Sequence, residues 1–318
     1  MTTAWVVGGS GLLGSAVRRA IGRRAGWDEL RAQPLPWSAP DEEFESAVRE
    51  RAARLLASAG AGGWAIVWTA GRSVPASSEA DAERELERSR IAFSTIAGEL
   101  RGQPDGALFL ASSAGGVYAG SSSPPFTEET EPAPLAPYGR LKLALEDLAA
   151  ATAADLGAPA VIGRIANLYG PGQDLSKPQG LISHLSLARF TSRTAHLYVP
   201  LDTLRDYVHV DDAAETVLDA LELARERGGV TTKIVASGLP TTISTLLATM
   251  RRVTHGRPRA VLGASPLSAR QPLDLRLRSV VWPELDRRGR RGLAEGVASV
   301  AGDVLAHVQA GGSSRAHA

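Results

Sequence analysis

The chain contains no cysteine, and this absence excludes disulfides, thiolate metal sites and thiol catalysis together. An excess of one charge is also missing, because acidic and basic residues nearly cancel to a formal net charge of +1. No global field favours nucleic acid or a membrane surface, so we expect neither as a partner. The six histidines, at positions 184, 196, 209, 255, 307 and 317, lack the paired spacing of metal ligands, so we expect no metal site.

Long apolar runs are missing as well. No segment approaches the ~20 apolar residues that span a bilayer, and no signal-peptide pattern precedes the first strand-like segment. We therefore expect a cytoplasmic protein. Lysine is scarce, since only Lys142, Lys177 and Lys233 occur among 35 basic residues. With 318 residues and 44% hydrophobic content, the chain can bury the core of one large domain or two associated ones.

Short apolar runs alternate with longer helix-patterned stretches through the first two thirds of the chain, as is typical of βαβ units around a parallel sheet. The strand candidates are 4–7, 65–69, 107–112 and 161–165, with a poorer one at 30–37 that carries two prolines. The helix candidates are 11–25, 80–100, 138–154, 211–226 and 243–252. The proline-rich segment 120–137 predicts a surface loop.

A glycine-rich turn follows the first strand candidate. Residues 6–14 read V-V-G-G-S-G-L-L-G and place Gly8, Gly11 and Gly14 three apart. A dinucleotide pyrophosphate binds backbone amides at a helix N-terminus, and side chains at these positions would obstruct the turn, the phosphate or the packing of helix on sheet. An ordinary turn in a glycine-rich chain is the alternative. The flanking strand and helix favour dinucleotide binding.

The phosphate state of the dinucleotide depends on the residues at the end of the second strand. An acidic residue about 20 positions beyond the glycines would bind the adenosine ribose and indicate NAD. We expect that strand to end near 35–38, where Trp37 and Ser38 offer no carboxylate, with Asp41 beyond and Arg31 before. The choice between NAD and NADP therefore stays open.

Tyr138 and Lys142 lie four residues apart immediately after Pro137, so a helix starting there places them on one face. A free phenol, with a pKa of about 10, is a poor base at neutral pH, but a nearby cation stabilises the phenolate. Such a tyrosine can exchange a proton with an alcohol or ketone during hydride transfer. A surface pair on an amphipathic helix is the alternative, and the scarcity of lysine counts against it.

Two hydroxyl groups end the strand candidate 107–112, in the segment L-F-L-A-S-S-A-G-G-V-Y. In open α/β sheets the carboxyl ends of the strands face the ligand crevice. Ser112 or Ser113 could therefore bond a reacting oxygen. Serines that only cap the strand in a turn are the alternative.

These motifs together resemble the extended short-chain dehydrogenase/reductase superfamily, and within it the NAD-dependent epimerase/dehydratase family of nucleotide-sugar enzymes. The resemblance covers the glycine-rich turn, the S-S-A-G-G-V-Y segment, Y-G-R-L-K from Tyr138, R-I-A-N-L-Y-G-P-G over 164–172 and R-D-Y-V-H-V-D-D over 205–212. It implies an α/β fold, a Rossmann doubly wound parallel sheet with a smaller C-terminal substrate-binding lobe. We expect the Rossmann domain over 1–167 with 205–237 returning to it, the lobe over 168–204 and 238–310, and a disordered tail over 311–318.

The resemblance also implies roles for single residues. Tyr138 resembles the catalytic acid or base, and Lys142 the residue that binds the nicotinamide ribose and assists the phenol. The contacts implied for NAD or NADP are Gly8, Gly11, Leu12, Leu13, Gly14, Ala70, Gly71, Ser112, Tyr138 and Lys142.

On the substrate side, Asn167 resembles an asparagine that contacts the nucleotide sugar, and Arg205 an arginine that binds its diphosphate, for which a guanidinium fork is suited. A salt bridge from Arg205 to Asp206 or Asp211 is the alternative. The resemblance further implies a homodimer formed through the helices at 80–100 and 138–154.

Two departures from the family pattern bear on the activity. Many relatives place a catalytic serine or threonine four residues before the tyrosine of the V-Y segment, where this chain has Ala114, so Ser113 would have to supply the catalytic hydroxyl and also contact the substrate. Relatives that eliminate water carry an Asp-Glu pair directly after that hydroxyl. Gly115 and Gly116 stand there instead, which disfavours a dehydratase.

The leading hypothesis is an NAD(P)-dependent oxidoreductase or epimerase that acts on a nucleotide-activated sugar through a 4-keto intermediate. An NAD(P)H-dependent 4-keto-sugar reductase is an alternative of the same class. A cofactor-binding protein with weak or no catalysis is an alternative from another class, supported by Ala114 and by Trp68, which stands where relatives often have histidine. Reduction of a non-sugar carbonyl is a third.

Overall fold

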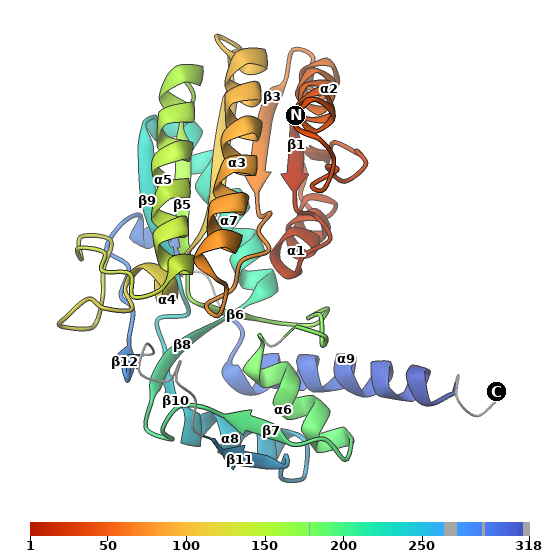
Figure 1. Cartoon of the computed structure of the whole chain (residues 1–318), viewed down its shortest axis with the longest axis vertical. Helices are drawn as coiled ribbons and strands as arrows, with labels where there is room; N and C mark the ends of the chain where they lie inside the picture. The colour runs from red at the N-terminus through yellow and green to blue at the C-terminus, as the bar shows by residue number, and fades with distance from the viewer. Residues whose placement is uncertain (178, 264–271, 288–289, 314–318) are drawn as a thin grey trace.

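A computed structural model of the chain describes residues 1–177, 179–263, 272–287 and 290–313 (Figure 1). The strands are β1 (Thr2–Val7), β2 (Trp27–Glu29), β3 (Gly63–Trp68), β4 (Gly106–Ser113), β5 (Ala160–Ile165), β6 (Asn167–Tyr169), β7 (Ala195–Leu197), β8 (Leu204–His209), β9 (Val230–Val235), β10 (Pro240–Thr242), β11 (Ala260–Leu262) and β12 (Asp274–Leu275). The helices are α1 (Leu12–Ile21), α2 (Asp41–Ala59), α3 (Glu79–Leu100), α4 (Ala114–Val117), α5 (Pro137–Leu156), α6 (Leu181–Phe190), α7 (Val210–Arg227), α8 (Ile243–Val253), α9 (Leu293–Ser313) and a 3-10 helix over Pro283–Arg287.

The large sheet has six parallel strands in the order β2-β1-β3-β4-β5-β9. The direction in which successive strands are added reverses at β1. In such sheets ligands bind at the carboxyl ends of the strands beside this reversal. The segments that follow β1, β3 and β4 are therefore where a dinucleotide site is expected.

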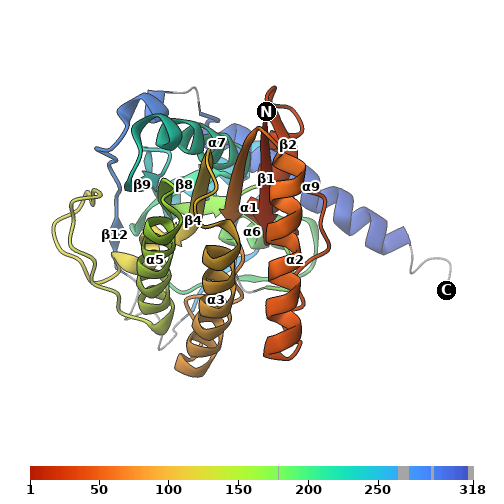
Figure 2. The same cartoon turned by 90° about the horizontal axis from the view of Figure 1, so that it is seen from above.

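Helices cover both faces of this sheet. Figure 2 shows α2, α3 and α5 side by side along one face, while α1 and α7 pack together on the other. The side chains of β3 alternate accordingly, because successive residues of a strand point to opposite faces. Trp64, Ile66 and Trp68 join the core under α2, α3 and α5, whereas Ala65 and Val67 join the core under α1 and α7.

A smaller part of the molecule lies beyond the carboxyl ends of the large sheet (Figure 1). It contains a second sheet of order β10-β8-β12, to which β6 adds by pairing with β8. Helices α6, α8 and α9 share an apolar core that includes Leu185, Leu246 and Val300. Within the described part of the chain, no helix is both long and apolar enough to cross a membrane.

The predicted α/β class with a doubly wound parallel sheet is confirmed. The strand predicted at 30–37 is wrong, because β2 spans Trp27–Glu29 instead. Leu30 and Leu35 are buried as the apolar pattern required, at 5% and 7% exposure. Pro34 and Pro36 carry no N–H, however, and cannot extend the ladder.

Other boundaries also differ from the prediction. The sequence analysis missed α2, and α9 continues to Ser313, so residues 311–313 are helical rather than part of a disordered tail. Residues 314–318 lie outside the described residues. Within 205–237, α7 and β9 do return to the large sheet, but β8 belongs to the second one. The division into two domains stays a prediction.

Candidate active site

The glycine-rich turn joins β1 to α1. Gly8 has a φ of +87°, and a Cβ built on it would lie 2.6 Å from the backbone nitrogen of Ala70, in the segment after β3. A Cβ on Gly14 would lie 2.3 Å from the carbonyl oxygen of Gly8. Gly11 caps α1 without a side-chain hydrogen bond, and the first turn contains no acidic residue. The helix N-terminus therefore presents free amides to an anion. Leu13 points into the core, so only its backbone could contact a cofactor, whereas Leu12 is partly buried and packs beside the core.

The end of β2, next to the glycine-rich turn, contains a carboxylate that the sequence analysis overlooked. Glu29 ends β2, and its Oε1 pairs with Arg18 Nε at 2.5 Å. The Arg18 side chain lies against the turn, because a Cβ on Gly9 would be 2.8 Å from Arg18 Cδ. The error in placing β2 concealed this residue. The Glu29 carboxylate can accept a hydrogen bond from a ribose hydroxyl, and the Arg18 guanidinium can bind a phosphate.

Tyr138 and Lys142 lie on one face of α5, which begins with Pro137 as its first residue. Lys142 Nζ is 5.6 Å from the centroid of the Tyr138 ring. The lysine is 8% exposed, and its ammonium makes a long hydrogen bond of 3.5 Å to the carbonyl oxygen of Ala111. It forms no ion pair with a described carboxylate. Its charge is thus available to a group next to Tyr138.

The two adjacent serines face different surroundings. Ser113 Oγ accepts a hydrogen bond of 3.2 Å from the Gly116 amide, and it faces the Tyr138 ring: a Cβ on Gly116 would lie 3.4 Å from Oγ and 2.9 Å from Tyr138 Cε1. Ser112 instead donates its hydroxyl to the buried carboxylate of Glu146. The structure therefore brings Ser113 to Tyr138, and Ser112, which we expected to bind cofactor, bonds into the core. Ala114 is fully buried.

A buried polar network lies next to Ser113 and Tyr138. Glu146 on α5 pairs with Arg164 on β5 at 2.7 Å, and both side chains are less than one tenth exposed. Arg164 Nη1 also donates to the hydroxyl of Tyr118 at 2.7 Å. Burial raises the pKa of Tyr118, so this phenol stays a neutral structural group. The network links β4 and β5 to α5, the helix that also carries Tyr138.

The predicted substrate residues lie on neighbouring strands of the second sheet, where β6 pairs with β8. Arg205 is 7% exposed, its Nη1 donates to the Leu204 carbonyl, and burial lowers the pKa of its guanidinium. The alternative salt bridges do not form among the described residues: the Asp206 carboxylate accepts the amides of Ser237 and Gly238, and Asp211 pairs with an arginine of α1. Asn167, exposed, donates to the Asp206 carbonyl at 3.1 Å.

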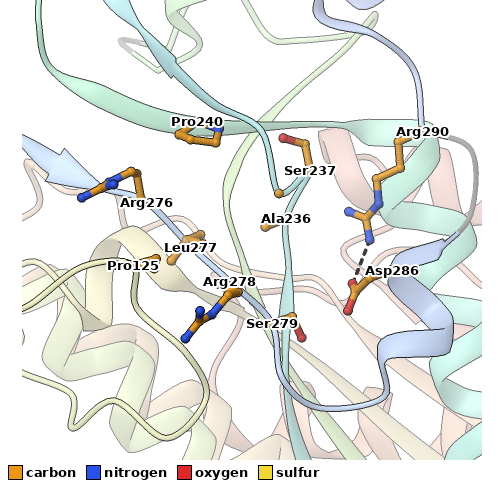
Figure 3. Close-up of a pocket in the computed structure, with 11 residues that line it drawn as sticks. Pro125, Ala236, Ser237, Pro240, Arg276, Leu277, Arg278, Ser279, Asp286 and Arg290 are labelled. Atoms are coloured by element: carbon orange, nitrogen blue, oxygen red, sulfur yellow. Dashed lines mark hydrogen bonds and ion pairs between the residues drawn. The ribbon is translucent and has the colours of Figure 1, made fainter.

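A separate pocket of about 400 Å³ lies next to the end of β9 (Figure 3). Ala236, Arg276 and Arg290 are among the residues that line it. Arg276 pairs with Asp274 at 2.8 Å and Arg290 with Asp286 at 3.0 Å, so both guanidinium groups already have carboxylate partners within the protein. No predicted site residue lines this pocket, and we do not assign the chemistry to it.

Comparison with known proteins agrees with these motifs. Residues 4–233 match the NAD dependent epimerase/dehydratase family. The dTDP-L-rhamnose 4-epimerase of Burkholderia thailandensis is 33% identical over 121 residues, which cover 38% of this chain and 33% of that protein. The dTDP-4-dehydro-6-deoxyglucose reductase of Escherichia coli is 30% identical over 115 residues, 36% of each. The chain thus spans about a third of the length of these curated relatives.

The fold has a close match among solved structures. The UDP-glucose 4-epimerase of Thermotoga maritima, solved with UDP-glucose, superposes with a TM-score of 0.78 at 20% identity and covers 97% of this chain and 100% of its own. At this identity the likeness supports the fold alone. The family match covers most of the chain, and the chain therefore belongs to the NAD dependent epimerase/dehydratase family.

Proposed function

We propose that the protein is an NAD(P)-dependent enzyme that oxidises a hydroxyl group of a nucleotide-activated sugar to a ketone and reduces it again, as a 4-epimerase does. The observation that carries this proposal is the meeting of Tyr138, Lys142 and Ser113 beside the glycine-rich turn. Relatives named as a 4-epimerase and a 4-keto-sugar reductase act on dTDP-sugars, which supports the same class of substrate.

In this mechanism Tyr138 acts as the phenolate: it accepts the proton of the sugar hydroxyl, becomes the phenol, and returns the proton when the ketone is reduced. Lys142 stabilises the phenolate through its positive charge, and Ser113 donates a hydrogen bond to the reacting oxygen. A bound nicotinamide dinucleotide supplies the acceptor and donor of hydride. Gly115 and Gly116 offer no carboxylate, so elimination of water lacks its acid and base.

For the cofactor we propose binding by the free amides at the start of α1, by the segment containing Ala70 and Gly71, and by Lys142. NAD or NADP fits the residues at the adenosine end: Glu29 suits the ribose of NAD, and Arg18 suits the 2′-phosphate of NADP. For the substrate we propose that Arg205 binds the diphosphate, since its buried guanidinium has no carboxylate partner among the described residues. Asn167 on the adjacent strand would contact the sugar nucleotide.

The alternative of a 4-keto-sugar reductase uses the same residues with NAD(P)H as a consumed substrate. The alternative of a binding protein with weak catalysis is supported by Ala114, whose side chain has no hydroxyl group. We further propose a homodimer through α3 and α5, which lie side by side on the outside of the large sheet.

The test is to incubate the purified protein with UDP- and dTDP-hexoses and to follow C4 by NMR and NADH or NADPH at ~340 nm, the reduced-nicotinamide band. A C4 epimer without net change in nicotinamide identifies the epimerase. Consumption of reduced cofactor by a 4-keto sugar identifies the reductase. Nucleotide-sugar binding in calorimetry without turnover of any of these substrates would instead support the binding protein.

A further inference from the structure

Two groups of opposite charge lie around Gly71, at the carboxyl end of β3. A Cβ built on Gly71 would lie 2.9 Å from Glu85 Oε1 and 3.6 Å from Lys142 Nζ. Glu85 comes from α3 and Lys142 from α5. Both therefore border one space, kept open by a glycine, at the same edge of the sheet as Tyr138.

The carboxylate of Glu85 is bonded on one side only. Its Oε2 accepts the backbone amides of Arg72 at 2.8 Å and Ser73 at 2.7 Å, which holds the segment after β3. Its Oε1 is buried and has no hydrogen-bond donor in the described part of the chain. A carboxylate oxygen without a donor is costly in a protein interior and indicates a missing partner.

The ammonium group of Lys142 also lacks hydrogen-bond partners, in its case acceptors. Its ammonium can donate three hydrogen bonds, and among the described residues it makes a single long one, to Ala111. The two charges do not form an ion pair with each other within 4 Å, so Lys142 does not serve as the missing donor to Glu85.

A vicinal diol matches this pair of groups. Each of its hydroxyls can donate to a carboxylate and accept from an ammonium, whereas a phosphate would be repelled by Glu85. We infer that Glu85 binds the cofactor, with Oε1 accepting a hydrogen bond from a hydroxyl of the ribose next to the nicotinamide, opposite Lys142. This inference rests on the proposed function, which places a nicotinamide dinucleotide at the carboxyl ends of the parallel strands.

The variant Glu85→Gln isolates the role of Oε1. A glutamine keeps one carbonyl oxygen for the amides of Arg72 and Ser73, but it replaces the free acceptor with a donor. Glu83→Gln is the matched control, because Glu83 lies on the same helix and is exposed. Each variant is compared with the wild-type protein by calorimetric titration with ADP and with ADP-ribose, which differ by the ribose in question.

We expect Glu85→Gln to weaken ADP-ribose binding about tenfold, the scale of one hydrogen bond to a charged group, and to leave ADP binding unchanged. Glu83→Gln should change neither. An equal loss for both ligands would overturn the inference, since Glu85 would then act only by holding the segment after β3. Unchanged ADP-ribose binding would overturn it too. If the wild-type protein bound neither these ligands nor their 2′-phosphate forms, which an NADP site would require, the proposed cofactor itself would be wrong, which is a different failure.

Discussion

Two polar clusters lie near the carboxyl end of β4, and they differ in how fully their groups are bonded. In the closed cluster, the Glu146 carboxylate accepts hydrogen bonds from the Ser112 hydroxyl and the Arg164 guanidinium, and Arg164 also donates to Tyr118. The open cluster contains Ser113, Tyr138, Lys142 and Glu85. Among the described residues these four side chains form no hydrogen bond with one another, and Glu85 Oε1 has no donor. The closed cluster is complete without a ligand, whereas the open one has capacity left for cofactor and substrate.

Tyr138→Phe, in the open cluster, should have the largest effect on activity. Removal of the phenolic hydroxyl takes away the group that exchanges the proton, so we expect the turnover rate to fall about 10²–10⁴-fold. Because the ring remains, the melting temperature and ADP binding should not change. A steady-state assay with the substrate identified by NMR, alongside calorimetry with ADP, measures both.

The closed cluster should respond in stability. Glu146→Ala leaves the Arg164 guanidinium buried without its carboxylate, and removal of one partner of a buried pair costs about 3–5 kcal/mol. Urea unfolding followed by circular dichroism measures the free energy of unfolding. Asp147→Ala is the control, because its side chain is exposed one residue further along α5. Equal losses for the two variants would show that Glu146 is not the centre of a stabilising network.

Ser112 and Ser113 are adjacent but belong to different clusters, so their alanine variants should have different effects. We expect Ser113→Ala to lower the rate about a hundredfold, the scale of losing one donor to a developing charge, with little effect on stability. Ser112→Ala should lower the free energy of unfolding by about 1 kcal/mol and leave the rate near that of wild type. Rates and free energies of unfolding are measured for both variants. A rate loss confined to Ser112→Ala would mean that Ser112 is the catalytic serine and Ser113 the structural one.

Local geometry explains which parts of this site the sequence predicts. Tyr138 and Lys142 share one helix face because they are four residues apart, and the glycine-rich turn lies between a strand and the helix after it. The helix α2 could also have been found, since Phe44, Val48 and Ala52 recur every four residues and are fully buried. These features depend on neighbours along the chain.

The residues that the sequence analysis missed depend on contacts between distant segments. Glu29 could be recognised only once the register of β2 against β1 was known, because this register sets where the strand ends. Glu85 meets Gly71 and Lys142 because three elements converge at one edge of the sheet. The period of a strand predicts that Ser112 and Ser113 point to opposite faces, but only the position of Glu146 decides which serine is structural.

The smallest expected effect concerns His209. Like the residues of the closed cluster, it has hydrogen-bond partners for its polar atoms. Its Nδ1 accepts the amide of Asp211 at the start of α7, and its Nε2 contacts Ser299 Oγ at 3.2 Å. Burial holds the pKa of His209 below its ordinary value, against the opposing charge of Asp211. The charged groups around it are Asp211, Asp212, Arg291 and Glu295.

The sign of the pH effect comes from this lowered pKa. An unfolded histidine takes up a proton near pH ~6.5, while the folded one resists it, so the unfolded state binds more protons there and the free energy of unfolding falls as the pH drops through that range. His209→Asn keeps an oxygen that can cap α7 but does not titrate. Between about pH 7.5 and 5.5, the free energy of unfolding measured with urea should therefore decline less for His209→Asn than for the wild-type protein. ADP binding at pH ~7.5 should stay the same, because His209 bonds to Asp211 and Ser299 and not to the open cluster. An identical decline in both proteins would mean that other groups carry the pH dependence, and a change in ADP binding would mean that His209 and the open cluster are coupled.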